Sequence, residues 1–511
     1  MIRRSLVLIV LVQGLLACGV APEEELAWEQ TGVDSRESAL LKLKLKSSKI
    51  VITGTAGADT ASVDYHPYLP DTAIVTLNGV SYLKGLADLY NPAIDGIIFS
   101  GDDGNDTFTN NTALPCVAHG GDGNDVLRGG SAADTLDGDA GNDLLYGNDG
   151  DDLINGGAGN DVINGGNGMD TIITVGLGVD AIFGGYQWDS FWVDSGDTIY
   201  DASSNELSLG HVHVISAFHH ISYNGGATST PVGLDPLGEV LGDALPITFS
   251  GVNIVDFGNK PLFGPAGPNK DDIFQGAVGD CYFLAALSAI ADSDPARIRN
   301  MVVALGDGTF AVRFHSAGTP VYVRVNARLW ANDLTGEPTY AGLGSGGALW
   351  VPIVEKAYTF MRRDQGRYAS IASGDGTHVG HLNSTVTYWT YPDSYTQPQV
   401  KQWIDDGEPA GAIRNARDAG VSAFLAWIDQ QRAADKPLVA GSVSGVRDTM
   451  TFTASNWRRG QHIYMIDRVI KSLMGTRVGM VLRDPYGFEV ELRDFTAIYY
   501  AVSAGARFDL L

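Results

Sequence analysis

Residues 269–287 read NKDDIFQGAVGDCYFLAAL and dominate the interpretation of the C-terminal half of the chain. The apolar run from Phe283 to Leu287, continued by Ile290, is long enough to form a buried helix that begins near Cys281. A thiol in the first turn of a helix feels the positive end of the helix dipole, which favours the nucleophilic thiolate. A lone cysteine in an apolar helix is more often inert packing, so Cys281 alone does not decide the function.

This stretch resembles the active-site segment of the calpain family of cysteine peptidases, where a Gln-Gly-x-x-Gly-Asp sequence precedes the catalytic cysteine. Gln275 and Gly276 open the matching sequence here, and Gly279 and Asp280 lead into Cys281. The resemblance implies that Cys281 is the nucleophile. It also implies that Gln275 supplies a side-chain donor of the oxyanion hole, which stabilises the tetrahedral intermediate of acyl transfer.

Three further blocks follow in the order that the family has. Residues 350–358, WVPIVEKAY, resemble a helix that packs beside the catalytic one. Residues 461–464, QHIY, resemble the segment with the catalytic histidine, here His462, and residues 482–487, LRDPYG, resemble the strand end with the third triad member. A cysteine followed by a histidine roughly 180 residues later is the arrangement expected of papain-like enzymes.

The third triad position departs from the family pattern. The family usually has Asn-Pro-Trp-Gly, whereas this chain has Asp484 followed by Pro-Tyr-Gly. An aspartate can still accept a hydrogen bond from the imidazole of His462 and hold its tautomer. Its charge would also stabilise the protonated imidazole and shift the pH range of activity. The same exchange leaves open a degenerate homologue that binds its partner without cleaving it.

A second pattern lies upstream, where aspartates return at fixed spacing. After Asp106 they stand nine residues apart, at Asp125, Asp134, Asp143, Asp152, Asp161 and Asp170. The surrounding sequence is close to Gly-Gly-x-Gly-x-Asp, with an apolar residue such as Leu127 two positions after the aspartate. Glycines permit turns with positive φ, and each aspartate adds a hard anionic oxygen.

These units resemble the glycine-rich nonapeptide repeat of the repeats-in-toxin proteins, a parallel β-roll that binds Ca²⁺ in its turns. The resemblance implies calcium as the cofactor and the seven periodic aspartates as its ligands. A flexible Gly/Asp-rich linker is the alternative that composition alone allows, but the strict period with its apolar residue disfavours it. Residues 131–133, SAA, interrupt the glycine pattern, so we expect fewer complete sites than repeats.

The charge of the chain fits this interpretation. The formal net charge is -26, from 34 Lys and Arg against 60 Asp and Glu, which argues against nucleic acid as a partner. Residues 101–185 contain 15 Asp and one Arg but no Lys or Glu, so this segment carries -14 of that charge. Such a stack would repel itself without bound cations.

The N-terminus predicts export. A basic start, an apolar run from Leu6 to Leu16 and a small residue precede Cys18, as in a cleaved signal, and the run is too short for a membrane-spanning helix. Residues 15–18, LLAC, resemble the lipobox of bacterial lipoproteins, which implies lipid modification of Cys18 and anchoring to a bacterial membrane. Gly19 favours the outer membrane or cell surface, and a secreted protein with an ordinary cleaved signal is the alternative.

The 511 residues therefore predict a multidomain chain, because single hydrophobic cores stop growing beyond roughly 250 to 300 residues. The expected fold is an all-β parallel β-roll followed by an α+β papain-like catalytic core. The expected parts are a signal peptide (1–17), a tether (18–46), the repeats (47–185), a β-rich connector (186–258) and the peptidase domain (259–511). His211 and His213 in the connector are spaced as metal ligands on a strand would be, but without partner cysteines they favour packing over zinc.

Together these features predict an exported, lipid-anchored, calcium-dependent cysteine endopeptidase that acts on proteins or peptides. One alternative is a calcium-loaded surface or adhesion protein whose peptidase-like half is inactive. Another is a transglutaminase-like acyl transfer, in which the same thiolate passes its acyl group to an amine.

Overall fold

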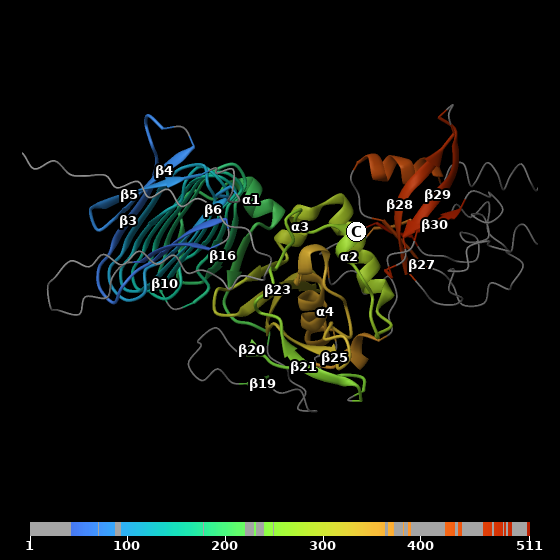
Figure 1. Ribbon diagram of the computed structural model, residues 1–511. Coiled ribbons are helices and arrows are strands. Elements are labelled where there is room, and N and C mark those ends of the chain that lie inside the picture. The colour runs from blue at the N-terminus through green and yellow to red at the C-terminus, as the bar shows by residue number, and fades with distance from the viewer. Residues whose placement is uncertain are drawn as a thin grey trace, which may run out of the picture.

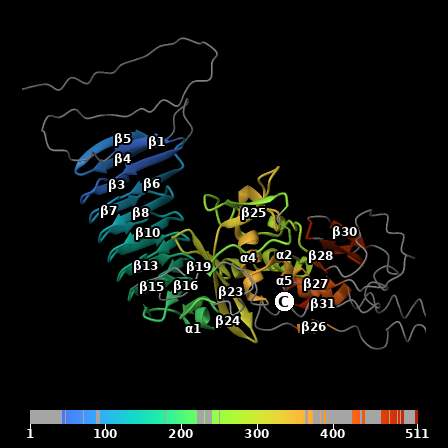
Figure 2. The same ribbon diagram turned by 90° about the horizontal axis from the view of Figure 1, so that it is seen from below.

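The computed structural model describes two large regions, a β-solenoid and an α+β region, which lie side by side (Figures 1 and 2). His462, Asp484 and Cys18 lie outside the described residues. The described residues are 42–46, 48–69, 71–86, 93–176, 178–219, 229–230, 240–248, 250–362, 366–372, 382, 387–389, 425–434, 438–441, 463–472, 475–483, 485–486, 489–492 and 508–510.

The solenoid consists of two nine-stranded sheets, and beyond the first strands the chain passes from one sheet to the other and back. The first sheet has the order β1 (Lys42–Lys46), β2 (Lys49–Thr53), β6 (Gly96–Ser100), β8 (Cys116–Asp122), β10 (Thr135–Ala140), β12 (Leu153–Asn155), β14 (Thr171–Ile173), β16 (Ser190–Asp194) and β18 (Val212–Ile215). The second has the order β17 (Thr198–Ile199), β15 (Ala181–Tyr186), β13 (Val162–Asn167), β11 (Leu144–Asp149), β9 (Val126–Arg128), β7 (Thr107–Asn111), β3 (Thr60–Tyr65), β4 (Thr72–Leu77) and β5 (Val80–Gly85). Figure 2 shows the stacked coils from the side.

The nine-residue repeat explains this alternation, because one repeat supplies one strand and one turn, and two repeats complete a coil. Leu136 therefore pairs in parallel with Ile154, and Ile154 with Ile172. These residues are fully buried, as is Leu127 on the opposite sheet, so one apolar residue per repeat fills the narrow core. At Gly123, where φ is +144°, a Cβ would lie 1.5 Å from the carbonyl oxygen of Gly104, so the turn admits only glycine.

The solenoid continues beyond residue 185, where the connector was expected to begin. β16 and β18 add two parallel strands to the first sheet, and Phe191 continues its apolar row. The short helix α1 (Ser204–Leu209) lies between these two strands in the chain, and Ser203 and Glu206 form a capping box at its start. The glycine motif is lost in these coils but the strands still pair. The parallel hydrogen bonding and the row of apolar residues are therefore sufficient to extend the stack.

The α+β region contains three further sheets and several short helices. The first sheet has the order β19 (Ser229–Thr230), β20 (Val240–Leu241), β24 (Thr319–Asn326), β23 (Thr309–Ser316) and β22 (Val302–Ala304), and β21 (Val252–Asp256) pairs with β25 (Arg328–Asn332). The third has the order β26 (Thr387–Trp389), β31 (Phe508–Leu510), β27 (Leu438–Gly441), β28 (Ile463–Lys471), β29 (Arg477–Arg483) and β30 (Glu489–Leu492). The helices are η1 (Lys270–Asp272), α2 (Cys281–Ser293), α3 (Pro295–Arg299), η2 (Ser345–Gly347), α4 (Trp350–Met361) and α5 (Tyr368–Ile371), and residues 425–433 are also helical.

Helix α2 lies at the centre of this region. It is apolar on nearly all sides, as expected of a helix with no solvent-facing stripe. Phe283 of α2 stacks on Tyr358 of α4 with ring centroids 4.0 Å apart. On another side, Ser288 lies 3.3 Å from the sulfur of Met465 in β28. We call the part of this region formed by α2, α4 and the sheet of β22, β23 and β24 the lobe; α2 thus lies between the rest of the lobe and the C-terminal sheet of β27, β28 and β29.

The sheet of β22, β23 and β24 is buried on both faces. Side chains along β23 alternate, so Phe310, Val312 and Phe314 join the core around α2 while Ala311 faces the solenoid. The solenoid face contributes Ile173, Trp192, Ile215 and Phe218, which pack against Val303, Leu305, Ala311 and Tyr322. We call these eight residues the solenoid–lobe interface.

His213 lies in the middle of this interface and is fully buried. Its ring lies 4.1 Å from that of Trp192, and its Nδ1 lies 3.2 Å from a guanidinium nitrogen of Arg313. Burial lowers the pKa of His213 well below its usual range, so the imidazole is neutral. The residue serves as packing between the two regions, in agreement with the sequence-based preference for a packing role.

In the part of the chain that the structure describes, no helix has the length and apolar character needed to cross a membrane.

Candidate functional site

Cys281 is the first residue of α2 and is 8% exposed. Asp280 forms the N-cap, and its carbonyl oxygen accepts the backbone N–H of Phe283 at 2.8 Å. The thiol is free. The structure therefore places the predicted nucleophile where the sequence predicted it, at the N-terminus of a buried central helix.

Gln275 lies in the loop before this helix and is also nearly buried. Its Nε2 donates to the carbonyl oxygen of Val278 at 2.6 Å and to Oδ1 of Asp280 at 3.3 Å. The side-chain amide is thus engaged within its own loop. To donate to an oxyanion beside Cys281, it must turn away from these two acceptors.

Glycine is required in this loop by a close backbone approach. A Cβ on Gly276 would lie 1.7 Å from the carbonyl oxygen of Tyr340. The N–H of Ala277 donates to the carbonyl of Thr339 at 3.0 Å, which fixes the approach. Gly276 therefore holds the predicted oxyanion loop against the segment that precedes α4.

The C-terminal sheet reaches the same loop. The backbone N–H of Gln275 donates to the carbonyl oxygen of Pro485 at 2.9 Å. Arg483 forms an ion pair with Asp271 at 2.8 Å. The residues on either side of position 484 are therefore both tied to the segment that leads into Cys281.

The strand that follows His462 is tied to this segment as well. Met465 of β28 belongs to the core around α2 and is fully buried. Asp467 of the same strand accepts from Lys270, and Lys270 also pairs with Asp292 at 3.0 Å. The sequence neighbours of His462 and Asp484 are thus assembled around α2, while the two side chains themselves lie outside the described residues.

Two buried carboxyl groups that lie close together next to Cys281 in the fold were not predicted from the sequence. Asp280 and Glu355 of α4 are both fully buried, and Oε2 of Glu355 accepts the N–H of Ala341 at 2.8 Å. Burial raises the pKa of Asp280 to about 7. Burial and the adjacent charge of Asp280 raise the pKa of Glu355 well above its usual range, so one proton is retained in the pair. The sequence feature that could have indicated this pair is the glutamate of WVPIVEKAY, a block for which the sequence predicts only a packing role.

The periodic aspartates form two ladders inside the solenoid. In each ladder, Oδ1 of an aspartate accepts the backbone N–H of a residue one coil earlier. The distances are 2.6 Å for Asp106 to Asp59, 2.6 Å for Asp125 to Asp106, 2.6 Å for Asp134 to Cys116, 2.7 Å for Asp143 to Asp125, 2.7 Å for Asp152 to Asp134, 2.8 Å for Asp161 to Asp143 and 2.9 Å for Asp170 to Asp152. One oxygen of each carboxylate therefore positions the neighbouring coil.

The second oxygen is buried and has no hydrogen-bond partner among the described residues in six of these carboxylates, those of Asp106, Asp125, Asp143, Asp152, Asp161 and Asp170. Unpaired buried anionic oxygens are strongly unfavourable, and hard cations such as Ca²⁺ take oxygen ligands of this kind. Burial accordingly raises their pKa values, to about 6 for Asp106, Asp161 and Asp170, to about 7 for Asp143 and to about 8 for Asp152. The carboxylates therefore fit a calcium ion.

Glycines of the turns lie against these unpaired carboxylate oxygens. A Cβ on Gly120 would lie 2.3 Å from Oδ2 of Asp125 and 2.7 Å from the carbonyl oxygen of Gly138. The same relation recurs at Gly147, where a Cβ would lie 2.3 Å from Oδ2 of Asp152. Glycine therefore lets each of these carboxylate oxygens pack against the backbone of the turn, where a side chain would clash with it.

Asp134 is the exception among the predicted ligands. Its Oδ2 accepts the backbone N–H of Gly130 at 2.6 Å, so it has no unpaired oxygen. This difference coincides with the interrupted glycine pattern at residues 131–133. Asp180 and Asp189 extend the ladders and were not among the predicted ligands, because each lies 19 residues after its ladder partner and so breaks the nine-residue period that runs from Asp125 to Asp170.

Comparisons with known proteins agree with both patterns. The model of the calpain family cysteine proteases matches residues 253–494, and that of the RTX calcium-binding nonapeptide repeat matches residues 117–145 and 137–172. These matches confirm the two expected resemblances, the fold class and calcium as a cofactor.

Individual relatives cover only part of the chain. The calpain-2 catalytic subunit of Bos taurus is 32% identical over 126 residues, which are 23% of this chain and 17% of that protein. The calpain-1 catalytic subunit of Rattus norvegicus is 26% identical over 242 residues, 46% of this chain and 30% of that protein. The calpain-type cysteine protease ADL1 of Oryza sativa is 30% identical over 123 residues, 24% of this chain and 5% of that protein. The chain thus spans less than a third of the length of each of these relatives.

Proposed function

We propose that this chain, in which residues 253–494 belong to the calpain family of cysteine proteases and residues 117–172 carry RTX calcium-binding repeats, is a calcium-dependent cysteine endopeptidase. The observation that carries the proposal is the hydrogen bond from Gln275 to Pro485, beside a free Cys281 at the start of α2. It joins the loop of the predicted nucleophile to the strand end of the predicted third triad member.

The proposed reaction is acyl transfer. The thiolate of Cys281 attacks the carbonyl carbon of a peptide bond, and the backbone N–H of Cys281 and Nε2 of Gln275 stabilise the resulting oxyanion. His462 gives its proton to the leaving amine, then takes one from the water that hydrolyses the thioester and frees Cys281. Asp484 orients His462. In this scheme Gln275 exchanges its bonds to Val278 and Asp280 for the oxyanion when substrate binds.

The repeats are proposed to bind calcium through Asp106, Asp125, Asp134, Asp143, Asp152, Asp161 and Asp170. Bound calcium would neutralise the unpaired carboxylate oxygens inside the solenoid. Asp134 is expected to contribute least, since its second oxygen is already satisfied by Gly130.

The solenoid–lobe interface supports a link between calcium and the peptidase. β23 packs against the solenoid through Ala311 and against the core of α2 through Phe310 and Phe314. A solenoid that unfolds without calcium would leave Trp192 and Tyr322 without their packing partners. We therefore expect calcium removal to destabilise the lobe that supports Cys281.

The substrates are proposed to be proteins or peptides. The location is proposed to be outside the cytoplasm, through export and a lipid anchor on Cys18 in the outer membrane or cell surface, and simple secretion is the alternative. Support comes from the signal-like N-terminus and from repeats that suit calcium-rich surroundings.

A second candidate is a calcium-loaded surface protein that binds its partner without cleaving it. Asp484 in place of asparagine is the observation that favours it.

The test uses full-length protein, wild-type and Cys281→Ala, with an unstructured substrate such as casein, in Ca²⁺ and in chelator. We expect cleavage only by wild-type protein with Ca²⁺. No cleavage by either protein would favour the inactive candidate. Incorporation of a primary amine in place of hydrolysis would identify a transglutaminase-like reaction.

A further inference from the structure

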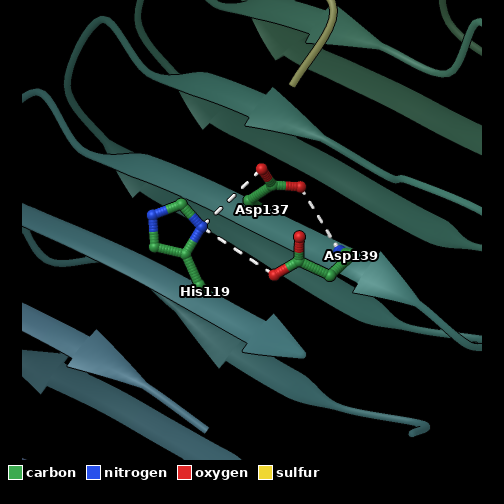
Figure 3. A group of neighbouring side chains, drawn as sticks. All are labelled: His119, Asp137 and Asp139. Carbon is green, nitrogen blue, oxygen red and sulfur yellow. Dashed lines mark hydrogen bonds and ion pairs between the residues drawn. The ribbon is translucent and has the colours of Figure 1, made fainter. Parts of the chain in front are cut away.

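We infer that His119, Asp137 and Asp139 form a binding site for a divalent transition-metal ion on the outer face of the solenoid, apart from the calcium-binding turns. Figure 3 shows the three side chains, one from β8 and two from the neighbouring strand β10, turned toward a common point. Nδ1 of His119 lies 3.7 Å from Oδ2 of Asp137 and 3.8 Å from Oδ2 of Asp139. The three ligand atoms lie within 4.8 Å of one another.

These distances suit three ligands of one ion better than direct hydrogen bonds. A nitrogen and an oxygen 3.7 Å apart are too far for a hydrogen bond. Ligands about 2.0 to 2.2 Å from a zinc-type ion stand about 3 to 4 Å from one another. The two distances from His119 lie in this range, and the carboxylate oxygens of Asp137 and Asp139 lie within 4.8 Å of each other.

Asp137 is held in place for such a role. It is 9% exposed, and its Oδ1 accepts from Nδ2 of Asn155 at 3.0 Å and from the backbone N–H of Asp139 at 3.3 Å. Oδ2 is left facing His119 beyond hydrogen-bond distance. A carboxylate oriented through one oxygen, with the other directed at the site, is the outer-shell support that metal ligands usually have.

Asp139 occupies a position that the repeat gives to glycine. Its φ is +64°, and Gly121 and Gly157, which hold the same place one coil before and after, have φ of +98° and +90°. An aspartate here accepts an unfavourable left-handed backbone where glycine would adopt it freely. The exchange adds the carboxylate that completes the cluster.

The ligand set identifies the class of ion. One imidazole and two carboxylates carry two negative charges, which match a divalent cation. Calcium takes oxygen ligands, whereas imidazole suits ions such as Zn²⁺ and Co²⁺. His119 and Asp139 are partly exposed, so water can fill the remaining coordination positions.

The site lies next to the solenoid–lobe interface. Asn155, which orients Asp137, also lies 3.5 Å from the carbonyl oxygen of Leu305 in the turn after β22. Through Asn155, an ion on Asp137 would therefore adjoin the contact between the two regions.

The test is Zn²⁺ binding to full-length protein in saturating Ca²⁺, followed by calorimetry, with Co²⁺ absorption as a second readout. Asp139→Gly restores the usual residue of the repeat and should fold normally. Asn148→Gly is the matched control, because Asn148 also has a positive φ, +76°, at the same repeat position but on the opposite sheet. We expect wild-type protein and Asn148→Gly each to bind one Zn²⁺ with the same affinity. Asp139→Gly should bind it at least about 100-fold more weakly, and Asn155→Ala should lower the affinity about 10- to 100-fold.

Equal Zn²⁺ stoichiometry and affinity in wild-type and Asp139→Gly would overturn the inference. Displacement of the bound Zn²⁺ by a higher Ca²⁺ concentration would also overturn it, because the cluster would then bind cations as an ordinary acidic surface does. Far-UV circular dichroism of each variant shows that the solenoid is intact. His119→Ala serves as an independent second variant, with the same loss expected.

Discussion

Calcium binding to the solenoid is expected to release protons in the weakly acidic range. The buried carboxyls of Asp106, Asp161 and Asp170 have pKa values raised to about 6, that of Asp143 to about 7 and that of Asp152 to about 8. The groups that remain protonated without calcium must ionise to bind it. From these values, roughly 2 to 3 protons should leave per chain at about pH 6.5, and fewer than about 0.5 at about pH 8.5.

The sign of the stability effect follows from the same values. A carboxyl whose pKa is raised by folding holds a proton that the unfolded chain has lost, so folding is favoured at low pH. The calcium-free solenoid should therefore lose stability as pH rises from about 4, the unfolded pKa, through the folded values of about 6 to 8. Calcium should reverse this trend, because it stabilises the ionised form.

The assay is isothermal titration calorimetry of full-length protein with Ca²⁺ in buffers of different ionisation enthalpy, at both pH values. The dependence of the binding enthalpy on the buffer gives the number of protons released. Asp152→Asn should lower that number by about one at about pH 6.5. Asp149→Asn, which alters an exposed carboxylate on the outer face, should leave it unchanged. Calcium binding without proton release at about pH 6.5 would refute the reasoning.

Three further changes test other parts of the structure. Gly276→Ala should destabilise the chain by about 1–3 kcal/mol in urea unfolding and reduce cleavage, because the added Cβ meets the carbonyl oxygen of Tyr340; unchanged stability and activity would contradict this. Trp192→Ala should remove about 3–5 kcal/mol of stability by opening the solenoid–lobe interface, and thermal unfolding in Ca²⁺ should then show two separate transitions where wild-type shows one. Asp484→Asn should shift the pH profile of cleavage to lower pH, because a neutral amide no longer stabilises the protonated imidazole of His462; an unchanged profile would show that Asp484 does not contact it.

The solenoid could be predicted well because its signal is local and periodic. One apolar residue and one aspartate per nine residues define the strand, the turn and the core position at once. The prediction weakened after Asp170, because Asp180 and Asp189 follow the ladder at altered spacing and without the full glycine motif. The predicted end of the repeats at residue 185 rests on the glycine motif of the turns, whereas the solenoid extends as far as its strands pair in parallel.

The solenoid–lobe interface and the buried carboxyl pair could not be predicted in the same way. Trp192 and Tyr322 are 130 positions apart, and no local pattern indicates that they meet. Asp280 and Glu355 each belong to a recognisable block, but only the packing of α2 against α4 shows that their carboxyls share one buried space. Long-range contacts of this kind depend on how the elements pack.

The most direct test of the peptidase assignment is covalent labelling of the thiols. Full-length protein in Ca²⁺ would react with a peptidyl electrophile directed at cysteine peptidases, and the modified residue would be located by peptide mass spectrometry. Cys116 is an internal control, because burial raises the pKa of its thiol far above the usual range. We expect modification of Cys281 alone, and we expect chelator and His462→Ala each to prevent it. An unmodified Cys281, or labelling equal to that of Cys116, would contradict the assignment of Cys281 as the nucleophile.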